Sequence, residues 1–334
     1  MQVFELTRRL IDIESITPNE REIGDYLWHV LYDLAQRFDG SIERMPVEKD
    51  RDNILVFFRK PVSVLSTHMD TVPPFIPSRD DGEFIWGRGA CDTKGIIASM
   101  ITAAEELLVE DTRNFGLLFV VGEERNSAGA HAAAKNPCGS NFLINGEPTE
   151  NRLALGSKGA LRYEIVARGR MAHSAYPELG ESAIEKLLAA LHKLLKLKLP
   201  VDEVLGPSTL NIGTIMGGRA PNVIPDEAQA EIFIRVVGDV KALRKKIKAA
   251  VTSYAEANEV LFIPAVHLGS LDGFETTVVA FTTDIPAFGE AWGQPFLIGP
   301  GSIHVAHTAE ERMPKAQLLE AVHLYKNLVM RLGI

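Results

Sequence analysis

The chain of 334 residues lacks most features that mark a specialised class of protein. Its two cysteines, Cys91 and Cys138, provide no disulfide framework, so a reducing cytoplasm is the simplest expected location. The first residues show no basic segment followed by an apolar one, and we expect no secretory signal. No apolar run is long enough to cross a bilayer. These absences predict neither a secreted disulfide-rich scaffold nor a membrane protein.

Clustered positive charge is also missing. The formal net charge is −9, and lysine and arginine do not gather on one face with interleaved aromatic residues. We therefore expect no nucleic-acid partner. The excess of acid has two interpretations. It can serve solubility alone, or some of the carboxylates can surround metal ions.

What is present is the composition of an ordinary globular protein, with 46% hydrophobic and 24% charged residues. The length favours two domains. The outer parts of the chain alternate apolar strands with amphipathic helices, which predicts an α/β domain with a mostly parallel sheet. The strands expected there are 54–58, 62–66, 117–121 and 142–144, and the helices 4–11, 23–34 and 95–109.

The middle of the chain has a different order of elements. Strand and helix patterns alternate as β-α-β-β-α-β, which is typical of a ferredoxin-like α+β unit. The expected segments are 161–168, 182–197, 208–216, 227–237, 240–257 and 260–266. We therefore predict a discontinuous catalytic domain at 1–157 and 268–334, with an inserted domain at 158–267.

Side chains that can bind metals follow several of the predicted strands. Glu123 and Glu124 come after 117–121, His68 after 62–66 and Glu147 after 142–144. The carboxyl ends of strands in such sheets meet at the functional edge. Each residue has a simpler interpretation alone, because acidic pairs at strand ends are usually solvated. Their repetition at one edge predicts a site.

Two further candidates lie in glycine-rich loops. Asp92 precedes the helix 95–109 and could simply be its N-cap. His307 follows the loop Gly299-Pro300-Gly301 and could be structural. Imidazole with carboxylate is a ligand set for zinc, with manganese or cobalt tolerable. In His68-x-Asp70, the carboxylate can hold the second ring nitrogen of a ligating histidine. Cys91 is expected to pack rather than bind metal.

The motifs containing these residues resemble one family. They occur in this order: 66–73 (STHMDTVP), 87–95 (GRGACDTKG), 122–124 (GEE), 146–149 (GEPT), 172–174 (AHS), 217–225 (GGRAPNVIP) and 299–308 (GPGSIHVAHT). The chain resembles the cocatalytic zinc peptidases and deacylases that include acetylornithine deacetylase, succinyl-diaminopimelate desuccinylase and the glutamate-releasing carboxypeptidases. The resemblance covers nearly the whole chain.

The resemblance implies a function for each matching residue. Glu123 is implied to be the general acid and base, and Asp70 to orient His68. The peptide bond between Asp92 and Thr93 is implied to be cis. Two Zn²⁺ ions, with Co²⁺ or Mn²⁺ as substitutes, are implied to share the following ligands: Asp92 as the bridge, His68 and Glu147 on one ion, and Glu124 and His307 on the other.

In the inserted domain, which the resemblance makes a lid and a homodimer interface, three residues match substrate-binding positions. His173 is implied to stabilise the oxyanion, Asn222 to approach the substrate, and Arg235 to bind a substrate carboxylate. For Arg235 a plain surface salt bridge is the alternative. The chain departs from the family pattern at Thr282-Thr283-Asp284, which leaves the substrate open.

We therefore expect a dizinc amidohydrolase that acts on a small N-acylated amino acid. The first expected activity is the deacetylation of N-acetyl-L-ornithine in arginine biosynthesis. Succinyl-diaminopimelate desuccinylase and a dipeptidase or carboxypeptidase are the alternatives within the family. A non-catalytic amino-acid-binding homologue is the alternative from another class, and it predicts the loss of ligands or base, all of which are present.

Overall fold

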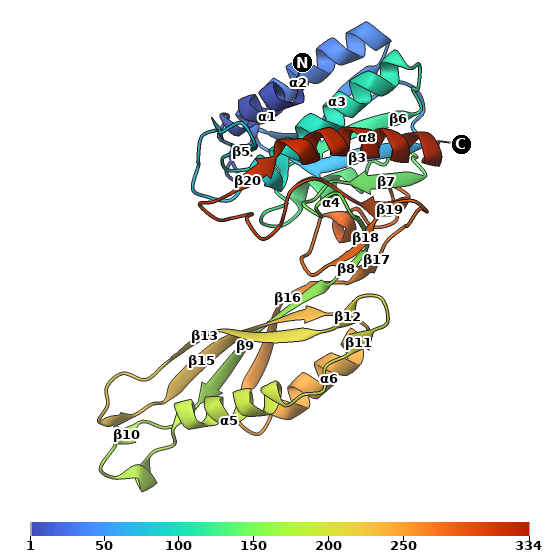
Figure 1. The fold of residues 1–334 in the computed structure, drawn as a ribbon. Helices are drawn as coiled ribbons and strands as arrows, with labels where there is room; N and C mark the ends of the chain where they lie inside the picture. The colour runs from blue at the N-terminus through green and yellow to red at the C-terminus, as the bar shows by residue number, and fades with distance from the viewer. Residues whose placement is uncertain (1, 334) are drawn as a thin grey trace. The chain divides into compact units, whose positions relative to one another are not determined.

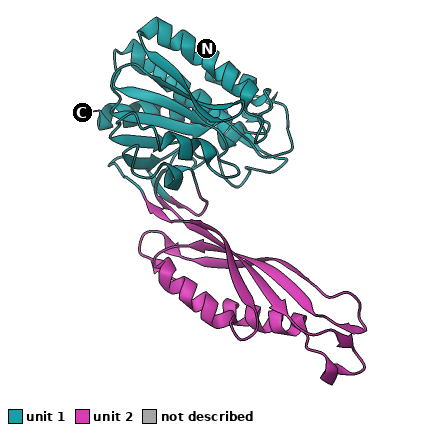
Figure 2. Ribbon diagram, turned by 180° about the vertical axis from the view of Figure 1, so that it is seen from behind, with its two compact units in different colours: residues 1–155, 268–277, 283–334 teal, residues 156–267, 278–282 magenta. Residues whose placement is uncertain are grey.

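The computed structural model describes residues 2–333 and divides the chain into two compact units. Unit 1 comprises Met1–Leu155, Leu268–Thr277 and Thr283–Ile334, and unit 2 comprises Gly156–His267 and Val278–Thr282 (Figure 2). The sequence placed 278–282 in the first domain. In the structure, the main-chain N–H of Lys158 donates to the carbonyl of Val279 at 3.1 Å, which joins this segment to the start of unit 2.

Unit 1 is built on a six-stranded sheet of order β1-β2-β6-β3-β7-β19 (Figure 1). The strands are β1 (Ser41–Glu48), β2 (Arg51–Phe57), β3 (Ser63–His68), β6 (Phe115–Val120), β7 (Phe142–Asn145) and β19 (Gln294–Leu297). The last four strands in that order run parallel to one another, and β1 and β2 form an antiparallel hairpin at the edge. The prediction of a mostly parallel sheet is confirmed.

Helices cover both faces of this sheet because the central strands are apolar on both sides. In β6, Leu117 and Phe119 belong to one core, whereas Leu118 and Val120 belong to another. The first core contains residues of α1 (Val3–Ile11), α2 (Arg21–Phe38), α3 (Gly95–Val109) and α8 (Lys315–Leu332). The second contains residues of α4 (Ala128–Ala133) and α7 (Ile285–Phe288). Continuous apolar runs are the pattern of strands buried on both faces.

Two small sheets and one turn belong to the rest of unit 1 and to the segments that connect the two units. One small sheet has the order β20-β5-β4, formed by β4 (Arg79–Asp80), β5 (Phe84–Trp86) and β20 (Arg312–Pro314). The chain passes from one unit to the other within the sheet β17-β8-β18, formed by β8 (Leu153–Ser157), β17 (Val266–His267) and β18 (Thr276–Val279). A distorted turn, η1 (Ala90–Lys94), leads into α3.

Unit 2 is a four-stranded antiparallel sheet of order β13-β15-β9-β16 with two helices packed on it. In chain order the elements are β9 (Gly159–Arg168), α5 (Ala183–Leu195), β13 (Thr209–Gly217), β15 (Glu227–Val236), α6 (Val240–Val251) and β16 (Glu256–Ile263). This is the predicted β-α-β-β-α-β order. The pairs β10 (Ala172–His173) with β14 (Val223–Ile224) and β11 (Val201–Asp202) with β12 (Gly206–Pro207), and the turn η2 (Pro177–Leu179), lie in the connections.

The end of the second helix and the bounds of the last strand in unit 2, predicted at 260–266 but observed at Glu256–Ile263, were wrong. The sequence continued the second helix to Ala257, but α6 ends at Val251, whose carbonyl accepts the N–H groups of Tyr254 and Ala255 at 2.8 Å each. The following residues pair with β9 as strand β16. Pairing with a distant strand overrides the local helical spacing here.

Candidate metal centre

The candidate site lies where the parallel strands of unit 1 end. His68 is the last residue of β3, and Glu123 and Glu124 follow β6 after a short turn. Glu147 follows β7, and His307 follows β19 after the Gly299–Gly301 loop. Because these strands are parallel neighbours, their carboxyl ends meet at one edge.

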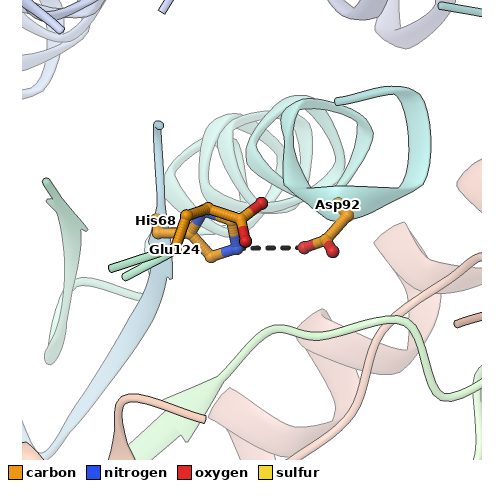
Figure 3. A group of neighbouring side chains, drawn as sticks. All are labelled: His68, Asp92 and Glu124. Atoms are coloured by element: carbon orange, nitrogen blue, oxygen red, sulfur yellow. Dashed lines mark hydrogen bonds and ion pairs between the residues drawn. The ribbon is translucent and has the colours of Figure 1, made fainter. Parts of the chain in front are cut away.

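Asp92 lies between two imidazoles. One of its carboxylate oxygens, Oδ1, is 3.0 Å from Nε2 of His68 (Figure 3). The other, Oδ2, is 3.1 Å from Nε2 of His307. The peptide bond between Asp92 and Thr93 is cis, as the resemblance implied. A carboxylate that turns one oxygen to each of two imidazoles has the arrangement of a bridging ligand.

Glu124 also contacts this group, through His307. Its two carboxylate oxygens are each 3.1 Å from Nε2 of His307. Ligand atoms of His68, Asp92 and Glu124 all lie within 4.8 Å of one another, which is close enough to surround a cation. Contacts thus link four of the five predicted ligands in a series, from His68 to Asp92, from Asp92 to His307 and from His307 to Glu124.

Glu147, the fifth predicted ligand, is buried, and its Oε1 has no hydrogen-bond partner among the described residues. Burial raises the pKa of Glu147 well above its usual range, and the negative charge of Asp92 adds to the rise. A buried carboxylate without a partner is unfavourable unless a cation pairs with it. Its orphaned oxygen, together with the imidazole and carboxylate donors around Asp92, fits a divalent metal ion.

The electrostatics of the two histidines show how much negative charge gathers here. Burial opposes the charged form of His68, but the carboxylates of Asp70 and Asp92 raise its pKa well above the ordinary value. Asp92 and Glu124 raise the pKa of His307 to about 10. The carboxylates therefore attract any positive charge that can reach them, whether protons or metal ions.

Asp70 serves the neighbouring turn as well as the histidine. Nδ1 of His68 is 3.0 Å from the carbonyl oxygen of Asp70 and 3.6 Å from its carboxylate. The carboxylate accepts the main-chain N–H groups of Gly122 at 2.9 Å, Glu123 at 3.1 Å and Glu124 at 3.2 Å. The Thr17 hydroxyl also donates to it at 2.6 Å. Asp70 thus fixes the turn that carries both glutamates, which the sequence did not indicate.

The two neighbouring glutamates differ in their surroundings. Glu124 faces His307, whereas no described residue donates a hydrogen bond to the Glu123 carboxylate. Burial raises the pKa of Glu123 well above its usual range, and the carboxylates of Glu147 and Asp284 add to the rise. A carboxylate with a high proton affinity and no competing partner is suited to accept a proton.

Two acids near the site were not predicted to belong to it. Asp284 is almost fully buried, neither of its carboxylate oxygens has a hydrogen-bond partner among the described residues, and burial raises its pKa to about 7. Glu311 is equally buried and accepts the main-chain N–H of Asp92. The only signal for Asp284 was the departure at 282–284, and the sequence analysis did not single out Glu311.

The three predicted substrate residues all lie in unit 2. Nδ1 of His173 accepts the N–H of Ala175 at 3.1 Å, so the proton of a neutral ring is on Nε2. The carbonyl of Asn222 accepts the N–H of Ser174 at 3.0 Å, which places Asn222 next to the His173 loop.

Arg235 lies on β15, and its guanidinium is 4.8 Å from the ring centre of Phe233. Within residues 2–333 it forms no ion pair, and burial lowers its pKa. The alternative of a plain surface salt bridge therefore finds no partner in the described chain. This half-buried cation is left available to an anion.

Known proteins match this chain along nearly its whole length. A family model described as "Peptidase dimerisation domain" matches residues 155–259. A peptidase M20 domain-containing protein of Schizosaccharomyces pombe is 39% identical, with 98% of this chain and 84% of the relative covered. A probable carboxypeptidase of Aspergillus terreus is 37% identical over 96% of this chain and 84% of its own length.

Solved structures of the same fold include two bacterial peptidases. Aminopeptidase PepT of Bacillus cereus has a TM-score of 0.83 at 20% identity, covering 99% of this chain and 98% of its own. A dinuclear metal binding peptidase of the M20 family from Bacillus subtilis has a TM-score of 0.73 at 17% identity, covering 99% and 98%.

A two-unit hydrolase fold with a histidine and carboxylate centre defines the class of this protein as a metal-dependent peptidase. The chain belongs to the M20 peptidase family. This confirms the resemblance and the prediction of a metallohydrolase. Neither curated relative is named for acetylornithine deacetylation, so that specific activity and a part in arginine biosynthesis have no support from them. No helix among residues 2–333 combines the length and apolarity needed to cross a membrane.

Proposed function

We propose that this protein hydrolyses the amide bond next to a free carboxylate, releasing the carboxy-terminal residue of a small peptide or of an N-acyl amino acid. The observation that carries the proposal is Asp92, whose two oxygens face His68 and His307 at 3.0 and 3.1 Å. The naming of a relative as a carboxypeptidase favours peptides over N-acetyl amino acids.

Five residues of unit 1 are proposed to hold two divalent cations, with zinc favoured and cobalt or manganese as substitutes. Asp92 would bridge them, His68 and Glu147 would hold one, and Glu124 and His307 would hold the other. When bound, such a pair of cations lowers the pKa of a shared water and polarises the scissile carbonyl. The ligands Asp92, Glu124 and Glu147 offset three of the four positive charges, and Glu123 can offset the fourth.

Glu123 moves the proton in this proposal. Its carboxylate takes a proton from the water as the water oxygen bonds to the carbonyl carbon. It then gives that proton to the amine nitrogen as the carbon–nitrogen bond breaks. The absence of a hydrogen bond to Glu123 from described residues leaves it free for this exchange, and Asp70 holds its main chain in place. General acid–base catalysis of this kind contributes about 10²–10⁴-fold to the rate.

Unit 2 is proposed to supply substrate contacts. The Nε2–H of His173 is a donor for the oxyanion that forms at the carbonyl. Arg235 offers the carboxylate of the substrate a two-pronged partner, and it has no ion pair of its own among residues 2–333. Asn222, which neighbours the His173 loop, is proposed to approach the substrate as well.

Deacetylation of N-acetyl-L-ornithine is the second candidate. The segment Asn145-Gly146-Glu147-Pro148-Thr149 resembles that branch of the family. An N-acyl amino acid presents the same amide and free carboxylate as the end of a peptide, so the proposed residues serve both substrates. Desuccinylation of succinyl-diaminopimelate uses the same groups.

A substrate panel tests the proposal. Zinc-loaded protein is assayed with di- and tripeptides, their carboxy-terminal amides, N-acetylornithine and succinyl-diaminopimelate. We expect free-acid peptides to be cleaved at least about tenfold better than their amides, and Arg235→Met to raise KM for the acids only. Equal cleavage of acids and amides would overturn the carboxylate requirement, and turnover of N-acetylornithine alone would establish the second candidate.

The matched dimerisation domain leads us to propose a homodimer formed through unit 2. Exposed apolar side chains of unit 2 support this: Leu188, Leu195, Ile215, Met216 and Val260. Light scattering on the eluting protein should give twice the mass of 36.7 kDa. Both cysteines are free, which fits the expected cytoplasmic location.

A further inference from the structure

A buried ion pair between Arg88 and Glu311 contacts the main chain of the Asp92 turn. The side chains are 2% and 1% exposed, and Nη1 of Arg88 donates to Oε2 of Glu311 at 2.5 Å. Neither residue offers an atom to the candidate centre itself. A buried pair of charges is costly to desolvate, so its gain in stability over apolar residues is small at best. Its contacts indicate a different use.

Glu311 holds the main chain of the bridging ligand. Its Oε1 accepts the N–H of Cys91 at 3.3 Å and the N–H of Asp92 at 3.3 Å. The carboxylate therefore binds the guanidinium with one oxygen and the Asp92 turn with the other. Movement of Glu311 would move the backbone from which the Asp92 carboxylate projects.

Arg88 holds the loop that carries His307. The same Nη1 that donates to Glu311 also donates to the carbonyl of Thr308 at 3.3 Å, one residue after His307. Its Nε donates to the carbonyl of Pro74 at 3.2 Å. One ion pair thus ties together Asp92 and His307, two ligands separated by more than two hundred residues in the chain.

The other half of the centre has different support. The carbonyl of His68 accepts the hydroxyl of Thr93 at 2.6 Å, and the ring faces the carbonyl of Asp70. Among residues 2–333, neither Arg88 nor Glu311 forms a hydrogen bond or ion pair with His68 or Glu147. The centre is therefore supported asymmetrically.

We propose that Arg88 and Glu311 form a positioning pair that sets the affinity of one of the two cations, the one between Asp92 and His307. Asp92 serves both cations, but the His68–Glu147 side has further contacts of its own, so removal of the pair should weaken that side less. This inference rests on the proposed dinuclear centre. Residues that support metal ligands without touching the ion typically change metal affinity by about 10–100-fold.

Metal affinity measured without turnover tests the pair. Metal-free protein is titrated with Zn²⁺ against a competing chelator of known affinity. We expect the natural chain to bind two ions. In Glu311→Gln, we expect the ion between Asp92 and His307 to bind about 10–100-fold more weakly, and the other ion to lose less affinity. Glu311→Gln leaves Arg88 buried without its partner, so the double variant Arg88→Gln/Glu311→Gln is measured too. Its affinity for the ion between Asp92 and His307 should also be lower than that of the natural chain.

The outcomes separate the two proposals. Fewer than two ions on the natural chain would overturn the dinuclear centre and this inference with it. If the natural chain binds two ions and both variants bind them with unchanged affinity, the positioning pair alone is overturned. The same holds if both ions lose affinity equally in the variants. The double variant Glu106→Gln/Lys326→Gln removes another ion pair of unit 1 and should leave both affinities unchanged.

Discussion

The two units of this protein differ most in where they keep their charged side chains. Unit 1 buries many of them within its fold: Glu20, Arg51, His68, Asp70, Arg88, Asp92, Lys94, Glu147, Asp284 and Glu311. The buried polar side chains in the described part of unit 2 are Ser157 and Ser208, neither of which is charged. Several of its charged residues pair at the surface, as Arg244 and Glu259 do.

The difference indicates that unit 2 is built for stability, whereas unit 1 gives up some stability to gather charged side chains around Asp92. Burying a charge costs free energy unless a partner compensates it. Unit 2 avoids this cost and is held by an apolar core between its sheet and two helices. Unit 1 accepts the cost around Asp92, where several carboxylates lack enough positive partners. We therefore expect substitutions in unit 2 to change stability or substrate contacts without changing metal binding.

The largest expected loss of stability comes from the core of unit 2. Ile232 lies in the central strand β15 and is fully buried, so Ile232→Ala should lower the free energy of unfolding by about 2–5 kcal/mol. Denaturant unfolding measures the loss. Val201→Ala, at a side chain 68% exposed in the same unit, should change it by less than about 0.5 kcal/mol. Loss of zinc affinity in Ile232→Ala would contradict the expectation that substitutions in unit 2 leave metal binding unchanged.

The next effect is on turnover. His173→Ala should lower kcat by about 10²–10³-fold, the usual result of removing one oxyanion donor, because the Nε2–H is lost. Zinc content should stay that of the natural chain. His192→Ala, in α5 of the same unit, serves as the control and should leave kcat unchanged. An unchanged kcat in His173→Ala would refute its proposed contact.

A smaller effect concerns metal-free protein and pH. Asp92 and Glu124 raise the pKa of His307 from 6.5 to about 10. This group therefore adds stability that is complete below about pH 6.5 and is lost as pH rises toward 10. The raised pKa of Glu147 acts in the same direction, because its ionisation in the folded state is unfavourable.

Chelated protein should accordingly melt at a lower temperature at pH 9 than at pH 6.5, by an amount that solvent screening reduces because the His307 side chain is 49% exposed. Differential scanning calorimetry measures the shift. His307→Gln should reduce the difference between the two pH values. A chelated protein that melts higher at pH 9 would contradict the charge balance inferred for unit 1.

The smallest effect is expected at a surface ion pair of unit 2. Arg244 and Glu259 are paired at 2.5 Å with side chains 35% and 32% exposed. Arg244→Ala should cost about 0.2–1 kcal/mol of stability, because water and salt screen such pairs. Unfolding is measured at low and at high salt, and the difference in stability between the natural chain and Arg244→Ala should be smaller at high salt. A loss above 2 kcal/mol would show that unit 2 depends on charge as unit 1 does.

The same contrast explains what could be predicted from the sequence. Apolar runs followed by His68, Glu123 and Glu147 indicated parallel strands whose ends meet, since both signals are local. Helix 95–109 was predicted with the bounds that α3 has. In unit 2, alternation of apolar and polar residues gave the order of elements.

What the sequence did not indicate depends on contacts between distant segments. Glu311 acts on Asp92 across more than two hundred residues, and no spacing reveals such a contact. The use of Asp70 by three main-chain N–H groups follows from the shape of the Gly122 turn. The return of Val278–Thr282 to unit 2 depends on its pairing with the start of that unit.

The central claim is our proposal that the two neighbouring glutamates have different roles, Glu124 as a metal ligand and Glu123 as the group that moves a proton. The most direct measurement compares zinc content and kcat in Glu123→Gln and Glu124→Gln. We predict two ions per chain in Glu123→Gln, with kcat lowered by about 10²–10⁴-fold, and a single tightly bound ion in Glu124→Gln. Loss of an ion in Glu123→Gln, with two ions kept in Glu124→Gln, would contradict the assignment.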